Sequence, residues 1–581
     1  MHDPAALELS RKTLLKTAAA AGLAAGTLGA LPRWTMPAAR AQSQPRAGMN
    51  ILFIMVDEMR TPYVYMPRAL QRAVVPSITK LGDEGARFTN YFASSNCCQP
   101  ARASQVTGLY THQIAIFGTT PQSDLNAGFP TFGTMLRQQG YETQWFGKWH
   151  ITPSDVSGPG TVNGCMADPY EAYGFTVPDP ASGSCPSPDG GGGQGQFMDP
   201  ITRQQFRDWI ADRPANGTPW FTTVSLINPH DIQFYPAATR RVQGEQFPRS
   251  LYRNLPANYE TTEGRNARRK PDLYEAIVEI SNASFGRLPD KTKGKTGKNW
   301  VKMLDTYALL QNMVDIQIFS VLKALANSPH ADNTVVVFVS DHGEYAGAHG
   351  LRGKGYGAYD EGLHIPLIVK DPSGTWIKDT KSDRHQMFSS VDLAALFMTI
   401  ATGSEAWRDD ARYAQIAGRA SIAAALKDPT ATGRRYIAHA TDEEAILPEQ
   451  ISGTPDAVPY DAPNHVTMVR TRLGKIARFA YWKEGGYQID TSREIQWECY
   501  DYRTRKGRLE LDNVYHSPAH RSFVKKMKKL LDYGVRAELR APVPSSLQAT
   551  QETAFQTWFG SDTTSPPMLP VRPGSFVSTN T

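Results

Sequence analysis

Four short stretches of the chain are continuously apolar instead of alternating between apolar and polar residues. They cover residues 49–57, 220–226, 334–341 and 365–369. Continuous hydrophobicity is typical of a strand that is buried on both faces, as in a parallel sheet covered by helices. Between them, residues 307–326 repeat apolar positions at spacings of three, four and seven, which predicts an amphipathic helix. Alternating strands and helices predict an α/β sandwich with a central, mostly parallel sheet.

Two of the apolar stretches end in an acidic residue. Asp57 closes the first stretch and Asp341 closes the third. In open α/β sheets, ligands gather beyond the carboxyl ends of the strands. We therefore expect these two carboxylates to share one site, although they lie far apart along the chain.

The second part of the chain has a different pattern. The sandwich pattern weakens there, and residues 465–482 and 485–502 are rich in strand-forming residues. A helix follows, with apolar positions at Phe523, Met527, Leu530 and Leu531. We predict a large domain over residues 48–395, a smaller α+β domain over residues 396–540, and an extended tail over residues 541–581, where Pro, Ser and Thr recur.

The first 41 residues are typical of an export signal. Basic residues within Ser10–Lys16 precede an apolar stretch, Thr17–Leu31, and Ala39-Arg40-Ala41 has the small-x-small form of a cleavage site. The segment resembles a twin-arginine signal with Lys12 at the second arginine position; a plain amphipathic helix is the alternative. Export predicts a periplasmic or secreted protein. We expect that the protein is not an integral membrane protein, because no other stretch of its sequence is long and apolar enough to span a bilayer.

Composition narrows the functional classes. The 581 residues are 40% hydrophobic and 20% charged, which is the balance of a globular protein and excludes a disordered chain or a coiled coil. Of the formal net charge of +6, the first 41 residues carry +3, from five basic against two acidic side chains. So small a surplus gives no reason to expect a nucleic acid partner. We interpret one lysine cluster as a solvated helix face: Lys525, Lys526, Lys528 and Lys529.

The chain has five cysteines, an odd number, so at least one is unpaired. Cys165 and Cys185 lie in one loop-like region, where they could form a local disulfide or stay reduced. Cys499 has the surroundings of a small, buried hydrophobic residue. The remaining two, Cys97 and Cys98, are adjacent and begin a motif.

Cys98, Pro100 and Arg102 form a Cys-x-Pro-x-Arg motif that Thr107-Gly108 complete. This motif resembles the signature of the sulfatase family, which belongs to the alkaline phosphatase superfamily. The resemblance extends from about residue 48 to about residue 535. Four further segments match the family in the right order: Gly140–His150, Asn228-Pro229-His230, Ser340–Glu344 with Lys354, and Glu498–Tyr502.

The resemblance implies an alkaline phosphatase-like sandwich and a formylglycine nucleophile. A separate maturation enzyme would oxidise Cys98 to 3-oxoalanine (formylglycine), since Pro100 and Arg102 stand at offsets two and four, a relation that Cys97 lacks. In the family, one hydroxyl of the hydrated aldehyde attacks sulfur and expels the alcohol, and the other drives the elimination of sulfate. The implied function is the hydrolysis of small-molecule sulfate monoesters to an alcohol and inorganic sulfate.

The resemblance also implies one divalent metal ion. Its ligands would be Asp57, Glu58, Asp341, His342 and the modified residue 98. Oxygen ligands suit Ca²⁺, which we expect first, or Mg²⁺, and a histidine nitrogen leaves Mn²⁺ open. Glu58 stands where the family usually has a second aspartate, and His342 stands at a family position that is either Asn or His.

Five basic side chains in the family motifs are expected to surround the reacting group. Lys148 and Lys354 are fixed positive charges for the sulfate oxygens. His150 is expected to hydrogen-bond the formylglycine hydroxyl, and His230, together with Lys354, to protonate the leaving oxygen. Arg102 is expected to hold the loop of the nucleophile and its charge.

Two other functions stay open. A phosphonate monoester or phosphodiester hydrolase of the same superfamily shares the nucleophile motif and the Asp-His pair, although Gly147–His150 has the sulfatase form. The second is a binding protein that kept the fold and lost catalysis, yet every chemical position except Glu58 is filled. The sequence leaves the alcohol open among aryl, alkyl, choline and sugar sulfates. His349 and His364 are expected to be structural.

Overall fold

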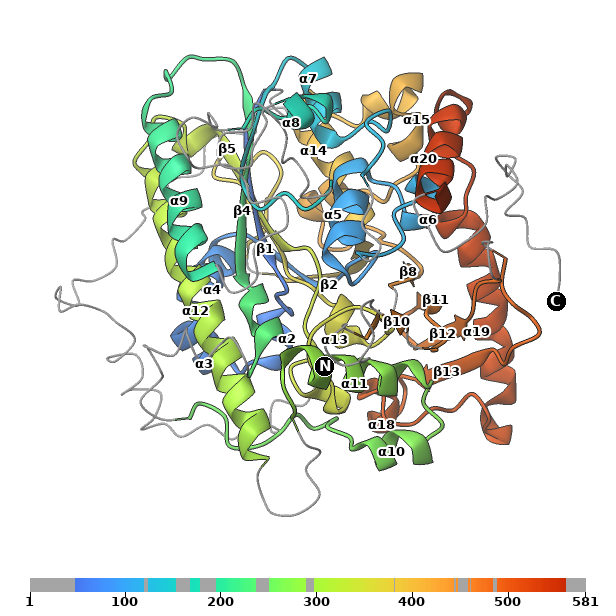
Figure 1. Cartoon of the computed structure of the whole chain (residues 1–581). Helices are drawn as coiled ribbons and strands as arrows, with labels where there is room; N and C mark the ends of the chain where they lie inside the picture. The colour runs from blue at the N-terminus through green and yellow to red at the C-terminus, as the bar shows by residue number, and fades with distance from the viewer. Residues whose placement is uncertain are drawn as a thin grey trace.

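The computed structural model describes residues 48–560, apart from residues 120–123, 153–167, 178–194, 237–249, 289–296, 381, 444–445, 448–457, 460 and 484–487. The export-signal prediction for residues 1–41 and the possible Cys165–Cys185 disulfide lie outside the described residues. The described chain forms a large α/β part and a smaller part with an antiparallel sheet, and the two pack against each other (Figure 1).

A seven-stranded sheet forms the centre of the large part. Its strand order is β3-β4-β1-β5-β6-β2-β7. All neighbouring strands are parallel except that β6 runs antiparallel to both β5 and β2. The strands are β1 Asn50–Asp57, β2 Ala86–Phe92, β3 Glu142–Gly147, β4 Trp220–Pro229, β5 Thr334–Ser340, β6 Leu367–Lys370 and β7 Arg384–Ser389. This confirms the predicted α/β class with a mostly parallel central sheet.

The side chains of β1 are divided between two hydrophobic cores. Odd-numbered positions 51–55 belong to the core that includes α5, α7 and α14, and even-numbered positions 52–56 to the core that includes α9 and α12. These helices span Cys98–Thr107, Phe132–Gln138, Leu393–Thr402, Gly195–Ala211 and Lys298–Ala326. Because helices cover both faces, a strand here has no polar side, which is the reason for its continuous hydrophobicity.

Helix α12 begins at Lys298, several residues before the predicted start near residue 307. Among the described residues it is the one helix long and apolar enough to cross a membrane by length and composition. Its apolar residues pack instead into the core with residues of β1 and β4 (Figure 1). The stripe that predicted the helix is therefore a core-facing stripe.

The other described helices of the large part are short. They include α2 Pro62–Tyr65, α3 Arg68–Val74, α4 Pro76–Glu84, α6 Thr111–Ile114, α8 Asp168–Ala172, α10 Thr262–Ala267, α11 Leu273–Phe285, α13 Asp360–Leu363, α15 Ala414–Ala417 and α16 Ile422–Lys427.

The smaller part is a four-stranded antiparallel sheet in the order β13-β12-β11-β8. Its helix α19, Arg521–Gly534, packs on β11 and β12 through Val524, Met527 and Leu531. The predicted strand-rich stretches contain three of the strands. The strands are β8 Ile437–Thr441, β11 His465–Arg470, β12 Gly474–Ala480 and β13 Gln496–Asp501.

The expected start of the small domain at residue 396 is wrong. Helices α14, α15 and α16 place residues such as Phe397, Ile416 and Leu426 in the same core as Phe53 of β1. The large part therefore continues to the end of α16, and the small sheet begins only at β8. These helices are short, so their apolar periodicity is too brief to indicate which core it faces.

The expected extended tail from residue 541 is also wrong over its described part. Residues Gln548–Gly560 form helix α20, after a single 3₁₀ turn at Ser545–Leu547. Leu547 and Phe555, two helical turns apart, are buried in the large core. The Pro, Ser and Thr content of the whole segment concealed this short apolar stripe.

Candidate active site

The ends of β1 and β5 are joined by hydrogen bonds at the carboxyl edge of the sheet. The hydroxyl of Ser340, the last residue of β5, accepts the Met59 N–H at 2.9 Å. The Glu58 N–H donates to Oδ1 of Asp341 at 3.2 Å. These bonds hold Asp57 beside Asp341, as their positions at the ends of neighbouring parallel strands predict.

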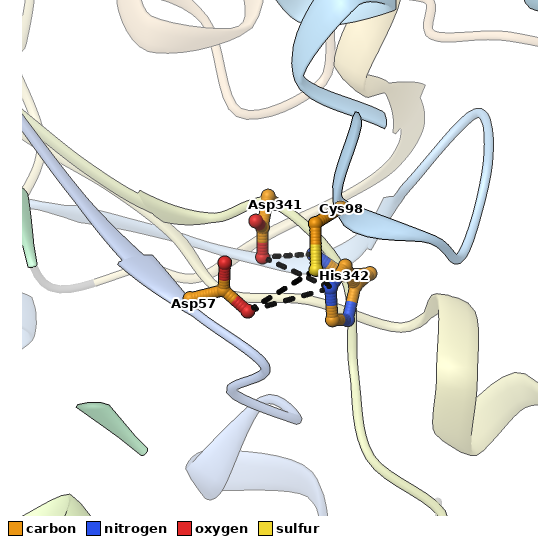
Figure 2. Close-up of side chains that lie close together, drawn as sticks. All are labelled: Asp57, Cys98, Asp341 and His342. Atoms are coloured by element: carbon orange, nitrogen blue, oxygen red, sulfur yellow. Dashed lines mark hydrogen bonds and ion pairs between the residues drawn. The ribbon is translucent and has the colours of Figure 1, made fainter. Parts of the chain in front are cut away.

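Cys98 reaches this edge as the first residue of α5, so it lies at the positive end of the helix dipole. Its Sγ is 3.1 Å from Nε2 of His342 and 3.7 Å from Oδ1 of Asp57 (Figure 2). One ligand atom from each of Asp57, Cys98, Asp341 and His342 lies within 4.8 Å of the others, and all four side chains are buried. The structure thus brings together residues that are widely separated in sequence.

Arg102 lies one helical turn after Cys98 and contacts one oxygen of each carboxylate in the site. Its guanidinium donates to Oδ2 of Asp57 at 3.0 Å and to Oδ2 of Asp341 at 2.7 Å. The Oδ1 atoms of the same carboxylates face Nε2 of His342, at 3.5 and 3.6 Å. The fully buried arginine therefore contacts both carboxylates with its single positive charge and leaves the other oxygen of each on the side of the nucleophile.

Lys148 enters the site directly after β3. Its Nζ lies 2.6 Å from Oδ2 of Asp57. Gly147 makes this turn with a φ of +85°, and a Cβ there would meet the Ser225 carbonyl oxygen at 2.0 Å. Only glycine combines the left-handed backbone with this close approach, so Gly147 is needed to direct Lys148 inward.

Lys354 and two histidines complete the surroundings of the thiol. Lys354 Nζ lies 2.8 Å from Oε2 of Glu58 and hydrogen-bonds with Cys98. His150 and His230 are each within hydrogen-bond reach of the same thiol. Every residue for which the sequence predicts a catalytic role therefore contacts Cys98 or the carboxylates beside it.

Charge around Cys98 favours its thiolate. Burial and the Asp57 carboxylate raise the pKa of the thiol, but Lys148, Lys354 and His342 outweigh them and hold that pKa well below its ordinary value. The site is therefore built to stabilise an anion at this position.

Two of the three histidines that contact the thiol, His150 and His230, stay neutral. Burial, followed by the positive charges of Lys354 and Lys148, lowers the pKa of His230 to about 3. Burial likewise lowers the pKa of His150. Near neutral pH both rings are hydrogen-bonding groups without charge, whereas the anionic neighbours of Lys354 raise its pKa despite burial and keep it protonated.

Glu58 lies beside the group of four, not within it, and forms a second candidate ligand group with Asp57 and His230. Burial raises the pKa of Glu58 well above its ordinary value against the opposing positive charge of Lys354, and the negative charge of the neighbouring Glu344 raises it further. Glu344 in turn accepts the N–H groups of Ala346 and Gly353 at 2.9 Å. Glu344 closes the Ser340–Glu344 motif, but the motif by itself does not indicate its role.

Asp199 is a second residue that the sequence did not indicate. It lies in α9 and accepts the backbone N–H groups of Ile227 at 2.6 Å and Asn228 at 3.0 Å. These bonds fix the end of β4, from which His230 extends as the first residue of a 3₁₀ helix. Nothing in the local sequence links Asp199 to that strand end; the amphipathic pattern of α9 was the only available signal.

The donor set fits a divalent cation. Asp57 and Asp341 each offer the oxygen that Arg102 does not contact, His342 offers Nε2, and residue 98 would offer an oxygen after oxidation. The four ligand atoms already lie close together in a buried site, where a cation would offset the carboxylate charge that Arg102 does not reach.

Comparison with known proteins identifies the family. A model of the sulfatase family matches residues 49–404, which is more than half of the chain. The chain belongs to the sulfatase family. A curated relative, the delta 4,5-hexuronate-2-O-sulfatase of Bacteroides thetaiotaomicron, is 24% identical over 338 residues, and the match covers 58% of this chain and 64% of that protein. The chain thus spans just under two thirds of the length of this relative.

Two solved structures share the fold of this sulfatase-family chain. One, from Bacteroides thetaiotaomicron and assigned to the sulfatases, has a TM-score of 0.63 at 19% identity and covers 84% of this chain and 92% of that one. The other, the phosphonate monoester hydrolase of Silicibacter pomeroyi, has a TM-score of 0.62 at 20% identity and covers 86% and 96%. These likenesses confirm the alkaline phosphatase-like sandwich.

Not every sulfatase motif contributes to the site. Glu498 lies in β13, where it accepts the hydroxyl of Tyr274 at 2.9 Å, and the adjacent Cys499 is fully buried. His349 Nδ1 pairs with Glu260 at 2.8 Å, and His364 stacks on Phe92. These residues hold the smaller sheet and the late loop in place, which is the structural role expected for both histidines.

Proposed function

We propose that this chain hydrolyses sulfate monoesters to an alcohol and inorganic sulfate, with a nucleophile made from Cys98. One observation carries the proposal: Cys98 lies at a helix N-terminus and is contacted by Lys354, His150, His230 and His342. Such a ring of donors stabilises negative charge at the attacking atom and on the oxygens of the group it attacks. Membership of the sulfatase family supports sulfate as that group.

Two groups that the family implies complete this site. A maturation enzyme would oxidise Cys98 to formylglycine, and Asp57, Asp341, His342 and residue 98 would hold one divalent cation, Ca²⁺ before Mg²⁺ or Mn²⁺. When bound, the cation supplies polarisation of a sulfate oxygen, and the formylglycine supplies the attacking hydroxyl. Glu58 is retained as a further candidate ligand, next to the cation.

The side chains around residue 98 have distinct tasks in the proposed reaction. Lys148 and Lys354 bind the sulfate oxygens as fixed charges. Lys354, which stays protonated, gives its proton toward the leaving oxygen, and the neutral His230 orients that oxygen by a hydrogen bond. His150 holds the hydroxyl of residue 98 in position for attack.

The alcohol and the location of the protein are also proposals. A sulfated sugar is the first substrate to test, because the hexuronate-2-O-sulfatase relative is named for one. The export signal predicted for residues 1–41 supports a periplasmic or secreted enzyme that acts on such material outside the cytoplasm.

The main test is mass spectrometry of the peptide that contains Cys98, from protein made in a host with the maturation system. We expect an aldehyde at residue 98, sulfate release from 4-nitrophenyl sulfate, and loss of that activity on chelation with recovery on adding Ca²⁺. The Cys98→Ala variant should fold and be inactive. An unmodified thiol in fully active enzyme contradicts the mechanism.

A second candidate function is phosphonate monoester hydrolysis. It is favoured by the TM-score of 0.62 to a phosphonate monoester hydrolase, which is nearly the score to the sulfatase structure. The two candidate functions are distinguished by measuring kcat/KM for an aryl sulfate monoester and for the matched aryl phosphonate monoester. A preference for the phosphonate would replace the sulfatase proposal, and binding without any hydrolysis would favour a non-catalytic binding protein.

A further inference from the structure

A basic cleft lies between helix α19, the turn that joins β11 to β12, and strand β7. Its volume is about 840 Å³. The cleft is lined by residues 386–387 of β7, residues 431–435 before β8, the turn 471–473, Arg503 and one side of α19. None of the residues around Cys98 takes part, so this is a separate site.

The charged residues of the basic cleft are all positive. Five line it and no acidic side chain does: Arg434, Arg435, Arg472, Arg503 and Lys526. Two of the five form ion pairs with acidic residues that do not line the cleft. Arg434 pairs with Asp392 and Glu538, and Arg503 pairs with Asp501. The other three keep their charge available for a ligand.

Three cations therefore face the cleft without a carboxylate partner among the described residues. Arg435 and Lys526 are exposed, and within the part of the chain that the structure describes no ion pair links either of them to an acid. Arg472 is exposed as well and donates only to the carbonyl oxygen of His385, at 2.9 Å. Like charges gathered on one concave surface repel one another, and a bound anion relieves that repulsion.

The floor of the cleft is apolar. Met387 and Met527 are buried beneath it, and Leu473 on the turn is 62% exposed. A ligand that fits must carry anionic groups on a molecular framework that can pack against apolar side chains. The volume is within the range of roughly 300–1,000 Å³ that holds a small organic ligand, which is enough for a short segment of a chain.

We propose that the basic cleft binds a segment of a sulfated oligosaccharide. Guanidinium groups such as Arg435 and Arg472 are weakly hydrated and match oxyanions with two parallel hydrogen bonds. The choice of sulfate as the anionic group rests on the proposed function. The cleft then holds a polymeric substrate at a point separate from Cys98, where single sulfate esters are cleaved.

Two other polyanions fit the cleft less well. A nucleic acid would use open aromatic faces for stacking, but Phe523, the one aromatic residue in the lining, is covered by Arg503 at 5.3 Å. An anionic membrane would need the apolar face of α19, and that face is packed on the sheet through Val524 and Leu531.

The test measures binding to the full chain carrying Cys98→Ala, so that no turnover accompanies binding. The probe is size-fractionated dextran sulfate, with unsulfated dextran as the neutral control, in isothermal titration calorimetry at fixed ionic strength. The cleft variant is Arg435→Ala with Lys526→Ala. The matched control is Lys525→Ala with Lys529→Ala, which removes the same charge from exposed positions outside the cleft.

We expect dextran sulfate to bind, dextran not to bind, and the cleft pair to weaken binding about tenfold, as the loss of two exposed ion pairs allows. The control pair should change the Kd by less than about twofold. Equal weakening by both pairs, no binding of dextran sulfate, or tighter binding of a DNA duplex or of phosphatidylglycerol vesicles overturns the proposal. A chain that binds through the cleft but hydrolyses no sulfate ester refutes only the proposed function.

Discussion

Lys354 Nζ lies 2.8 Å from Oε2 of Glu58, and this ion pair joins the late loop of the site to the residue that follows β1. Asp57 Oδ1, at 3.6 Å, is the more distant partner of the same ammonium group. Glu58 therefore has a task that does not require a metal, which is to hold the charge of Lys354 beside Cys98. The ion pair therefore gives Glu58 a role as the partner of Lys354, which is distinct from the role of metal ligand that the family resemblance implies.

The Glu58→Gln substitution distinguishes these roles. Because Glu58 pairs with Lys354 and lies outside the group of four, we expect metal affinity to fall only about 10- to 100-fold, the range for partners that support ligands. Asp341→Asn, at a residue within that group, should abolish binding. Titration of the apoprotein with Ca²⁺ measures both. If Glu58→Gln binds as little metal as Asp341→Asn, Glu58 is a ligand, as the family resemblance implies.

Arg102→Ala should destabilise the fold as well as the chemistry. Removing the guanidinium takes the buried cation away from two fully buried carboxylates: Asp341 loses its arginine partner, and Asp57 keeps only Lys148 and the more distant Lys354. The free energy of unfolding of the metal-free protein should fall by roughly 3–5 kcal/mol. Urea denaturation in the presence of a chelator measures this loss.

The control for Arg102 is Arg87, whose ion pair with Asp383 is partly exposed to solvent. Arg87→Ala should cost less than about 1 kcal/mol, because water screens a pair at the surface. A similar loss for both variants would show that the buried position of Arg102 does not matter.

Asp199→Asn should slow the enzyme most for substrates with poor leaving groups. The amide would direct a donor at one of the N–H groups of Ile227 and Asn228, which would shift the end of β4 and with it His230. We expect kcat/KM for an alkyl sulfate to fall about 10- to 100-fold. The effect on 4-nitrophenyl sulfate should be much smaller, because its leaving oxygen needs little protonation.

Asp208 on the same helix provides the comparison for Asp199. Its carboxylate is exposed and accepts a hydrogen bond from Gln204 on the same helix. Asp208→Asn should leave both substrates unaffected. An equal loss on alkyl and aryl sulfates in Asp199→Asn would indicate general loosening of the site instead of a misplaced His230.

His439 predicts a dependence of stability on pH. Burial, followed by the positive charge of Lys475, lowers the pKa of this histidine from 6.5 to about 3 in the folded state. Below pH 6.5 the unfolded chain binds a proton that the folded chain refuses, so stability falls as pH falls from 6.5 toward 3 and is fully present above 6.5. His439→Gln should reduce this slope by up to about 1.4 kcal/mol per pH unit.

Urea denaturation at several pH values between 4 and 7 measures the slope for His439. The matched variant is His385→Gln, at an exposed position on β7. It should leave the slope unchanged. If the free energy of unfolding of His439→Gln depends on pH as steeply as that of the unsubstituted protein, His439 accepts its proton while the protein stays folded.

Much of the sulfatase architecture could be predicted from local sequence. The stretches that became β1 and β5 were recognisable because a strand covered on both faces must be apolar throughout. Asp57 and Asp341 followed from their positions at the ends of those strands. The spacing of Cys98, Pro100 and Arg102 then indicated the family, and with it the lysines and histidines of the site.

Other features depended on contacts between distant segments. No local pattern predicts that Leu547 and Phe555 return to the large core, or that Asp199 holds the strand end before His230. Likewise, Arg435 and Lys526 meet in one cleft only because α19 packs beside the start of β8. Local patterns determine which elements form, since periodicity and turn chemistry act within one element. Packing between elements decides the rest, because burial and pairing are properties of the whole fold. It decides which oxygen of Asp57 faces Arg102 and which charged side chains lie together without a partner.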